Sequence, residues 1–231
     1  MAPAEVPPDG PAAVPGLPSR AEYDAATKVH LTHGAPFKAD VTVVDIGGGP
    51  MVVKDFAQRA WWRRLIGRLE VRRECRAYAY LGPMPWFPAF IGCIDAEALA
   101  VEKIDGVTLA FAPDRRVRRD DYLDQIRAAL GRLTEVGFLH LDARNYRNLL
   151  LRPDGRVVFI DLAGSFWIPP GRPGHRLLRR FIGLYYEANI IKWETILHPD
   201  GDPRCGMKKP PRYLHGLYDL GKAWKRLRER R

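Results

Sequence analysis

The chain has 231 residues, of which 46% are apolar and 10% aromatic. This composition is enough to fill the core of one domain or of two small lobes, and it excludes an intrinsically disordered chain. The three cysteines are too few and too scattered for a disulfide framework, and no Cys/His spacing predicts a zinc site. Since no apolar run approaches the roughly 20 residues of a membrane-spanning helix, we expect a cytoplasmic protein.

The net charge of +10 lies almost entirely in the last quarter of the chain. Lys and Arg outnumber Asp and Glu by 15 to 6 in residues 171–231, but only by 11 to 10 in residues 101–170, and the two classes are equal at 11 each in residues 1–100. This asymmetry favours an anionic partner such as a phospholipid surface, a phosphorylated glycan or nucleic acid. A solvated surface that only keeps the protein soluble is an equal alternative, so peripheral contact at the inner face of a membrane stays open.

The N-terminal half predicts a small antiparallel sheet. Residues 1–22 are rich in Pro and Ala, do not resemble a signal peptide, and predict a flexible leader. The segment "VTVVDIGGGPMVVKDF" predicts a hairpin of strands Val41–Ile46 and Met51–Phe56 joined by a glycine turn. A strand just upstream, followed by a loop at Gly34–Lys38, extends the hairpin to a three-stranded meander.

A long helix follows the meander. Residues 57–81 contain good helix formers, and the spacing of Leu65, Leu69, Cys75 and Tyr78 or Ala79 predicts roughly one apolar face. We expect Trp61 and Trp62 to pack in a core or between lobes.

Two further strands, Phe90–Ile94 and Ala98–Lys103, follow three prolines. Residues 23–104 therefore predict a lobe of five strands with one helix inserted after the third strand.

Residues 105–231 predict a second, mainly helical lobe with a basic C-terminal tail. A helical stripe of four apolar residues precedes a hairpin whose turn is Arg152–Gly155, and a last helix covers about Leu177–Leu197. The stripe consists of Leu123, Ile126, Leu130 and Leu133.

Three oxygen-bearing side chains gather at the open end of this hairpin. Asn148 and Asp161 stand at the outer ends of the two strands, and Asp142 lies in the loop that leads to them. Oxygen ligands of this kind suit Mg²⁺, which completes its coordination shell with substrate phosphates and water. A further carboxylate can accept the proton of an attacking hydroxyl, so the set is typical of phosphoryl transfer.

The same pattern resembles the catalytic and metal-binding segments of the protein-kinase-like superfamily. His140-x-Asp142 with Asn148, followed by Asp161-Leu-Ala after a short strand, is closest to the minimal bacterial RIO-like and lipopolysaccharide-kinase branches. The resemblance implies an α+β, two-lobed fold, with a small antiparallel sheet and one helix in the N-lobe and a mainly helical C-lobe. It also implies a kinase that uses ATP and Mg²⁺.

The resemblance implies a role for each matching residue of the C-lobe. Asp142 is the catalytic carboxylate that faces the acceptor hydroxyl, and Arg144 points toward the transferred phosphate. Asn148 and Asp161 hold the metal. The segment from Asp142 to Asn148 is one residue longer than the usual kinase loop.

In the N-lobe the resemblance covers the nucleotide contacts. Lys54 in "VVKDF" pairs with Glu74, which is preferred to Glu70, and positions the ATP phosphates. Glu102 in "AVEKIDGVTL" marks the hinge strand that receives adenine. The glycine-rich phosphate loop is reduced to Gly34.

The acceptor is less well specified. The short segment after Asp161 lacks a long activation segment, which favours a sugar of a glycolipid such as lipopolysaccharide core, with a protein Ser/Thr as the competing acceptor. A kinase-fold binding protein without transfer activity and an RNA-associated RIO-like ATPase remain alternatives. Nucleic acid is the less favoured partner, because no base-reading motif is visible.

Overall fold

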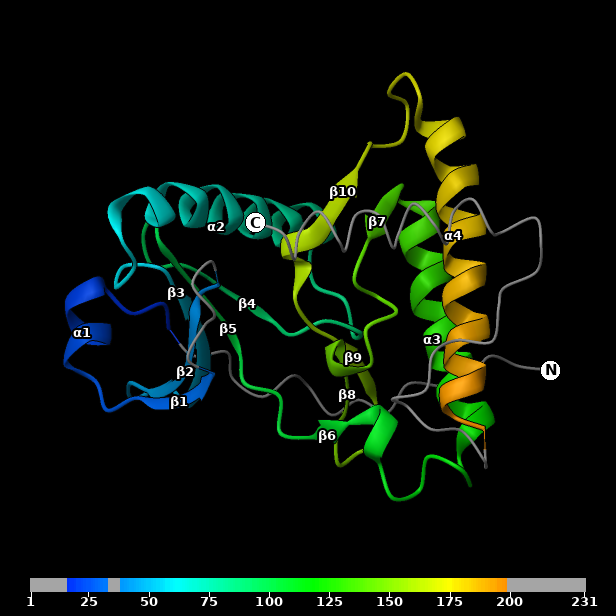
Figure 1. Cartoon of the computed structure of the whole chain (residues 1–231), viewed down its shortest axis with the longest axis horizontal. Helices are drawn as coiled ribbons and strands as arrows, with labels where there is room; N and C mark the ends of the chain where they lie inside the picture. Colours follow the sequence, from blue (N-terminus) through cyan, green and yellow to red (C-terminus); the bar gives the residue numbers. More distant parts are fainter. Residues whose placement is uncertain (1–15, 33–37, 199–231) are drawn as a thin grey trace. The chain divides into compact units, whose positions relative to one another are not determined.

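A computed structural model describes residues 16–32 and 38–198 of the chain. Most of the expected leader, Gly34 and the basic C-terminal tail lie outside the described residues. The chain divides into two compact units, residues 1–68 with 89–103 and residues 69–88 with 104–231. Both belong to an α+β structure with antiparallel sheets and, in the described part, four α-helices (Figure 1).

The first unit is built on a five-stranded antiparallel sheet with the strand order β1-β2-β3-β5-β4. This confirms the meander, the hairpin and the insertion of one helix, α2, after the third strand. The strands are β1 (Val29–Thr32), β2 (Asp40–Asp45), β3 (Pro50–Asp55), β4 (Phe90–Cys93) and β5 (Ala98–Glu102).

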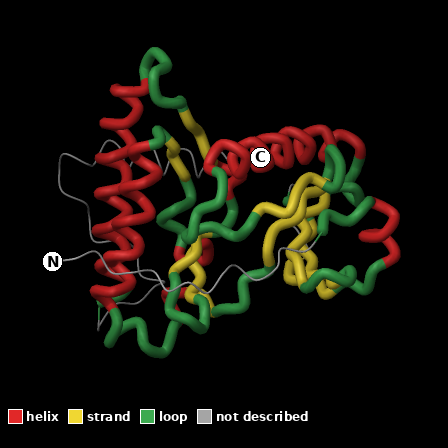
Figure 2. The backbone as a smooth tube through the Cα atoms, turned by 180° about the vertical axis from the view of Figure 1, so that it is seen from behind, coloured by secondary structure: helices red, strands yellow, loops and turns green. Residues whose placement is uncertain are grey.

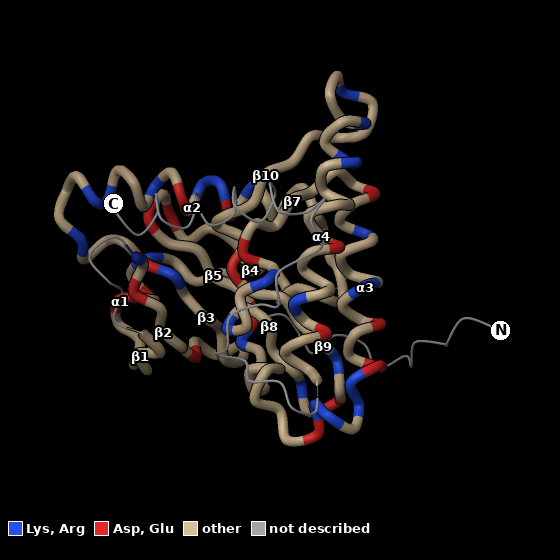
Figure 3. Tube along the Cα trace, turned by 45° about the vertical axis from the view of Figure 1, so that its right-hand side comes forward, with Lys and Arg blue, Asp and Glu red and all other residues tan. Residues whose placement is uncertain are grey.

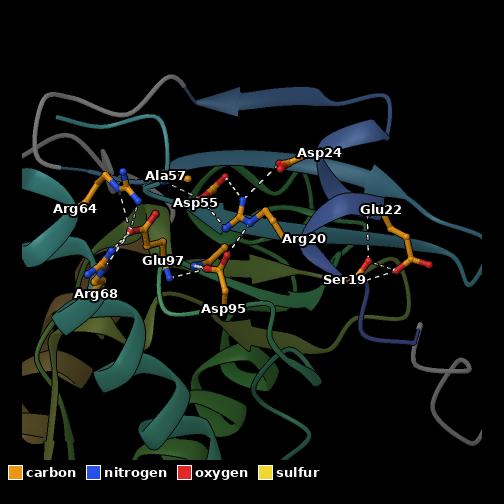
Figure 4. Close-up of polar contacts among 11 residues, drawn as sticks. Ser19, Arg20, Glu22, Asp24, Asp55, Ala57, Arg64, Arg68, Asp95 and Glu97 are labelled. Carbon is orange, nitrogen blue, oxygen red and sulfur yellow. Dashed lines mark hydrogen bonds and ion pairs between the residues drawn. The ribbon is translucent and has the colours of Figure 1, made fainter. Parts of the chain in front are cut away.

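A short helix, α1 (Arg20–Ala25), overlaps the end of the expected leader and is fixed to this sheet. Its N-terminus has a capping box, in which Ser19 and Glu22 satisfy each other's backbone N–H groups. Arg20 donates hydrogen bonds to Asp55 at 2.8 Å and to Asp95 at 2.7 Å (Figure 4). Tyr23 of the helix joins the core cluster of the unit, with Val44, Met51, Val53, Ala98 and Ala100.

Of the apolar face predicted for the helix α2 (Trp61–Leu81), Tyr78 is buried, but the two leucines are not. Gly67 and Val71 are buried, whereas Leu65 and Leu69 are 50% and 68% exposed. The cause is a close approach of the helix to Phe56, because a Cβ on Gly67 would lie 2.3 Å from the Phe56 Cγ.

Two arginines fix the same rotation of α2. Arg64 and Arg68 both donate to the buried carboxylate of Glu97, at 2.9 Å and 2.7 Å (Figure 4). The expectation that Trp61 and Trp62 pack inside is wrong for the same reason, since both rings are exposed.

The second unit contains two long helices and two small sheets (Figure 2). The helices α3 (Arg119–Glu135) and α4 (His175–Ile196) lie side by side, and the predicted leucine and isoleucine stripe of α3 is buried. The strands β6 (Val107–Thr108), β8 (Leu149–Leu151) and β9 (Val157–Phe159) form one sheet, and β7 (Phe138–His140) pairs with β10 (Ser165–Trp167). Short 3₁₀ turns, η1 (Leu109–Phe111), η2 (Tyr146–Asn148) and η3 (Leu162–Gly164), connect these elements.

No helix of the described part is both long enough and apolar enough to cross a membrane.

Candidate functional site

The predicted hairpin of the second unit is present, and its open end has the expected composition. Strands β8 and β9 pair antiparallel with Leu149 opposite Phe159. The N–H of Ile160 donates to the carbonyl of Asn148 at 2.9 Å, which extends the pairing by one residue. Asn148 and Asp161 therefore stand on neighbouring chain segments at the end of the hairpin remote from its turn.

Asn148 is buried but not fully hydrogen-bonded. The residue is 7% exposed, and in the described part of the chain its Nδ2 has no hydrogen-bond partner. Buried amides are rarely left in this state, because an unsatisfied donor costs about 1–3 kcal/mol. A buried side chain with unused hydrogen-bonding capacity suits a residue that binds a ligand, which fits the metal-holding role expected of it.

Asp161 has an unusual backbone conformation. With φ 69° and ψ 78° it is the one non-glycine residue with positive φ among the described residues. Such a conformation costs about 1–3 kcal/mol and is concentrated at functional sites, where the surrounding structure imposes it. It places the carboxylate at the sharp junction between β9 and η3.

The segment that follows Asp161 is fixed by two neighbouring residues of α2. The buried Glu74 carboxylate accepts the N–H of Leu162 at 3.3 Å, and Arg73 Nε donates to the carbonyl of Ser165 at 2.8 Å. Glu74 thus binds the residue next to Asp161. Its expected pairing with Lys54, in preference to Glu70, stays a prediction.

The loop from Asp142 to Asn148 consists of two successive turns. The N–H of Asn145 donates to the carbonyl of Asp142 at 3.0 Å, and the N–H of Asn148 donates to the carbonyl of Asn145 at 2.9 Å. The Asn145 side chain caps η2 by accepting the N–H of Arg147. The additional residue of this loop is therefore accommodated by regular turn geometry.

Three side chains of α4 hold this loop through its backbone carbonyls. Tyr185 donates to the carbonyl of Leu141 at 2.5 Å, and Trp193 Nε1 donates to that of Ala143 at 3.1 Å. Lys192 Nζ donates to the carbonyl of Arg144. Sequence reasoning assigned no role to these donors, although Tyr185 and the pair Lys192–Trp193 are seven and eight positions apart on one helical face.

The histidine of the motif is structural, as predicted. His140 is fully buried with its ring at 71° to that of Phe159, and its backbone N–H donates to the Tyr186 hydroxyl at 2.8 Å. The same hydroxyl donates to the carbonyl of Phe138 at 2.9 Å.

Burial raises the pKa of both adjacent tyrosines, and that of Tyr185 reaches about 12. The nearby charge of Arg144 lowers the pKa of Tyr185 and that of Asp142 raises it. Because burial raises the pKa of both tyrosines, both are neutral hydrogen-bond donors at physiological pH.

The remaining predicted residues lie in the first unit. Lys54 is the penultimate residue of β3, opposite Val41 of β2 and Leu99 of β5. At the end of β5, the N–H of Glu102 donates to the carbonyl of Ala89 at 2.9 Å, and its Oε2 accepts the N–H of Ala89 at 3.0 Å.

Gly34 falls outside the described residues. The site geometry given above belongs to the second unit, which contains Asp142, Arg144, Asn148, Asp161 and Glu74.

Within the described ranges, no group of three or more His, Cys, Asp or Glu side chains could hold a metal. A metal held by Asn148 and Asp161 would have few protein ligands and would depend on phosphate and water, as Mg²⁺ commonly does.

No protein-family model matches the chain, and no curated protein matches it.

Proposed function

We propose that the protein is an ATP- and Mg²⁺-dependent phosphotransferase of the protein-kinase-like kind, with the two units acting as its two lobes. The observation that carries this proposal is the placement of Asp161. It follows directly on Ile160, whose N–H bonds the carbonyl of Asn148 at the open end of the hairpin, and it has a strained backbone that Glu74 fixes one residue later.

Each residue of the second unit has a distinct role in the proposal. Asp142 accepts the proton of the acceptor hydroxyl, and Arg144 binds the transferred phosphoryl group with its guanidinium. Asn148 and Asp161 hold Mg²⁺, which neutralises charge on the phosphates when it is bound. The α4 donors keep Asp142 in place, because the carbonyls on both sides of it are hydrogen-bonded.

The first unit binds the nucleotide in this proposal. Lys54 positions the ATP phosphates, the β5 segment that ends at Glu102 receives adenine, and Gly34 belongs to the phosphate loop. Because the Glu102 N–H is already bonded to Ala89, we expect adenine to use the backbone of the residues that follow.

The acceptor we favour is a hydroxyl of a lipid-linked sugar, with a protein Ser/Thr as the second choice. Support comes from the short connection between Asp161 and α4, which contains only η3, β10 and a Pro/Gly loop. A peptide substrate usually requires a longer docking segment at this point.

The test is nucleotide binding measured by thermal unfolding, with and without Mg²⁺. ATP at about 100 times its dissociation constant stabilises a protein by about 2.7 kcal/mol, which for this size corresponds to a rise in Tm of about 5–10 °C. Asp161→Asn should abolish the Mg²⁺-dependent part of the rise. Asparagine tolerates positive φ, so this variant removes the charge without adding backbone strain.

Two further variants separate binding from transfer. Asp142→Asn should keep the Mg²⁺-dependent stabilisation, but phosphoryl transfer from labelled ATP to a glycolipid extract should fall by about 10²–10⁴-fold. Asp154→Asn is the matched control, since Asp154 lies in the turn of the same hairpin, where it pairs with Arg156. It should behave as the wild type.

If ATP with Mg²⁺ does not stabilise the wild type, the proposal of a phosphotransferase is wrong. Stabilisation by ATP that Asp161→Asn leaves intact would instead support a kinase-fold binding protein without transfer activity.

A further inference from the structure

The outward face of α2 carries the largest group of exposed apolar side chains on any element of the described residues. Trp61 and Leu69 are 73% and 68% exposed, and they lie two turns apart on the same side of the helix. The group consists of Trp61, Trp62, Leu65, Ile66 and Leu69. A surface helix normally turns such a stripe toward the core, so its exposure points to a partner.

The rotation that exposes this face is held by specific contacts. Opposite the stripe, Gly67 packs against Phe56, and at the edge of the stripe Arg64 and Arg68 bind the buried Glu97. Turning the apolar stripe inward would break both sets of contacts. The exposed face is therefore a stable feature of the fold.

The exposed charges around the stripe are mainly positive. Arg72 and Arg76 are exposed one and two turns beyond Leu69, and Figure 3 shows further basic positions along the helix. The acidic residues of α2 are Glu70, which is half-buried, and Glu74, which is buried and bonded to Leu162. A solvent-facing surface that combines large apolar side chains with arginines is complementary to an amphipathic anionic surface.

We infer that the outward face of α2 docks on an anionic phospholipid membrane. Trp61 and Trp62 have the amphipathic rings that favour the interface between headgroups and acyl chains, and Leu65, Ile66 and Leu69 supply apolar area to insert there. Arg72 and Arg76 contact the negatively charged headgroups. This inference does not depend on phosphotransferase activity.

Other occupants fit this face less well. The C-terminal residues 199–231 contain ten Lys and Arg against four Asp and Glu, so their charge would be repelled. A second copy of the chain would bring two arginine-rich faces together. Nucleic acid would gain from the tryptophans and arginines but not from Leu65, Ile66 and Leu69, which neither stack on bases nor form hydrogen bonds.

The experiment measures binding of the full chain to phosphatidylcholine vesicles in which about a third of the lipid is phosphatidylglycerol, by co-sedimentation without nucleotide. Leu65→Gln/Leu69→Gln should weaken binding at least about ten-fold, because the inserted apolar area is lost. Arg72→Gln/Arg76→Gln should weaken it roughly five-fold for each arginine removed, and added salt should reduce that difference. Leu31→Gln is the control, since Leu31 on β1 is an equally exposed leucine at 54%.

A second measurement locates the contact without relying on affinity. Brominated lipid in the same vesicles should quench tryptophan fluorescence, and Trp61→Phe should remove much of this quenching.

Absence of vesicle binding would overturn the inference, and so would equal binding by the wild type and Leu65→Gln/Leu69→Gln. Light scattering and an RNA-binding titration address the rival occupants. A dimer that this double variant converts to a monomer, or RNA binding that it abolishes, would assign the face to a second copy or to RNA instead.

Discussion

Replacing Gly67 by alanine should destabilise the protein, although alanine is the better helix former. In an open helix position the change gains about 1 kcal/mol. Here the new Cβ would lie 2.3 Å from Phe56 Cγ and 2.6 Å from Phe56 Cβ, whereas carbon atoms pack at about 3.5–4.0 Å. The nearest atoms belong to the base of the Phe56 side chain, so α2 itself must move by more than about 1 Å.

Overpacking of this kind costs about 1–3 kcal/mol, and the severity of the contact places Gly67→Ala near the upper end. After subtraction of the helix-propensity gain, we expect a net loss of about 2 kcal/mol, or a fall in Tm of about 4–8 °C. Gly131→Ala in α3 is the matched control, because nothing lies within 4 Å of its added Cβ. It should raise the Tm by about 2–4 °C. Equal stabilisation by both substitutions in urea and thermal unfolding would refute the close approach of α2 to Phe56.

Three further predictions concern the contacts that hold the two units in shape. Burial opposes a lower pKa of Glu97, but hydrogen bonds from Arg64 and Arg68 outweigh it and lower that pKa. The ionised Glu97 therefore stabilises the fold above pH 4.5, its ordinary pKa, and this stabilisation is lost as the pH falls through the lower pKa of the folded state. Glu97→Gln should therefore lower the free energy of unfolding by about 1–2 kcal/mol at pH 7, a figure already reduced because both arginines are partly exposed to solvent. Urea unfolding should show a smaller loss at pH 3, and a loss that does not change with pH would contradict the ion pairs. Burial raises the pKa of Tyr185 from 10.0 to about 12. The neutral Tyr185 hydroxyl therefore contributes fully to the stability of the fold below pH 10, and this contribution is lost as the pH rises toward 12. Tyr185→Phe should flatten the alkaline loss of stability, which is about 2–3 kcal/mol over this range, whereas an unchanged alkaline transition would show that the hydroxyl is not buried. Trp193→Phe keeps a buried ring but leaves the carbonyl of Ala143 without its donor, which should cost about 1–3 kcal/mol by chemical denaturation. If Trp193→Phe reduces the proposed phosphoryl transfer more than an equally destabilised variant such as Gly67→Ala does, Trp193 is a positioning residue. If both variants lose transfer activity in proportion to their loss of stability, its role is purely structural.

The elements that could be predicted from the sequence are those with local causes. The β2–β3 hairpin and the β8–β9 hairpin have glycine-containing turns between apolar runs, and both are present; the bounds of β2 and β3 are shifted by one residue from the predicted ones. The apolar stripe of α3 is regular enough to identify its buried face. Placement of Asn148 and Asp161 at one end of a hairpin follows from the hairpin itself, so this part of the site was predictable as well.

What could not be predicted depends on contacts between distant residues. The periodicity of α2 favours burial of Leu65 and Leu69, but the contact of Gly67 with Phe56 decides the orientation, and no local pattern reveals it. The left-handed conformation of Asp161 is equally invisible, because aspartate adopts positive φ only where its surroundings impose it.

The α4 contacts have a consequence for how the site could diversify. Tyr185, Lys192 and Trp193 bind main-chain carbonyls of the loop, so these hydrogen bonds do not depend on which side chains the loop carries at positions 141 and 144. In the proposed phosphotransferase, the loop would supply the groups that meet the acceptor, and α4 supports the loop through its backbone. Recognition and support would then depend on separate stretches of the chain.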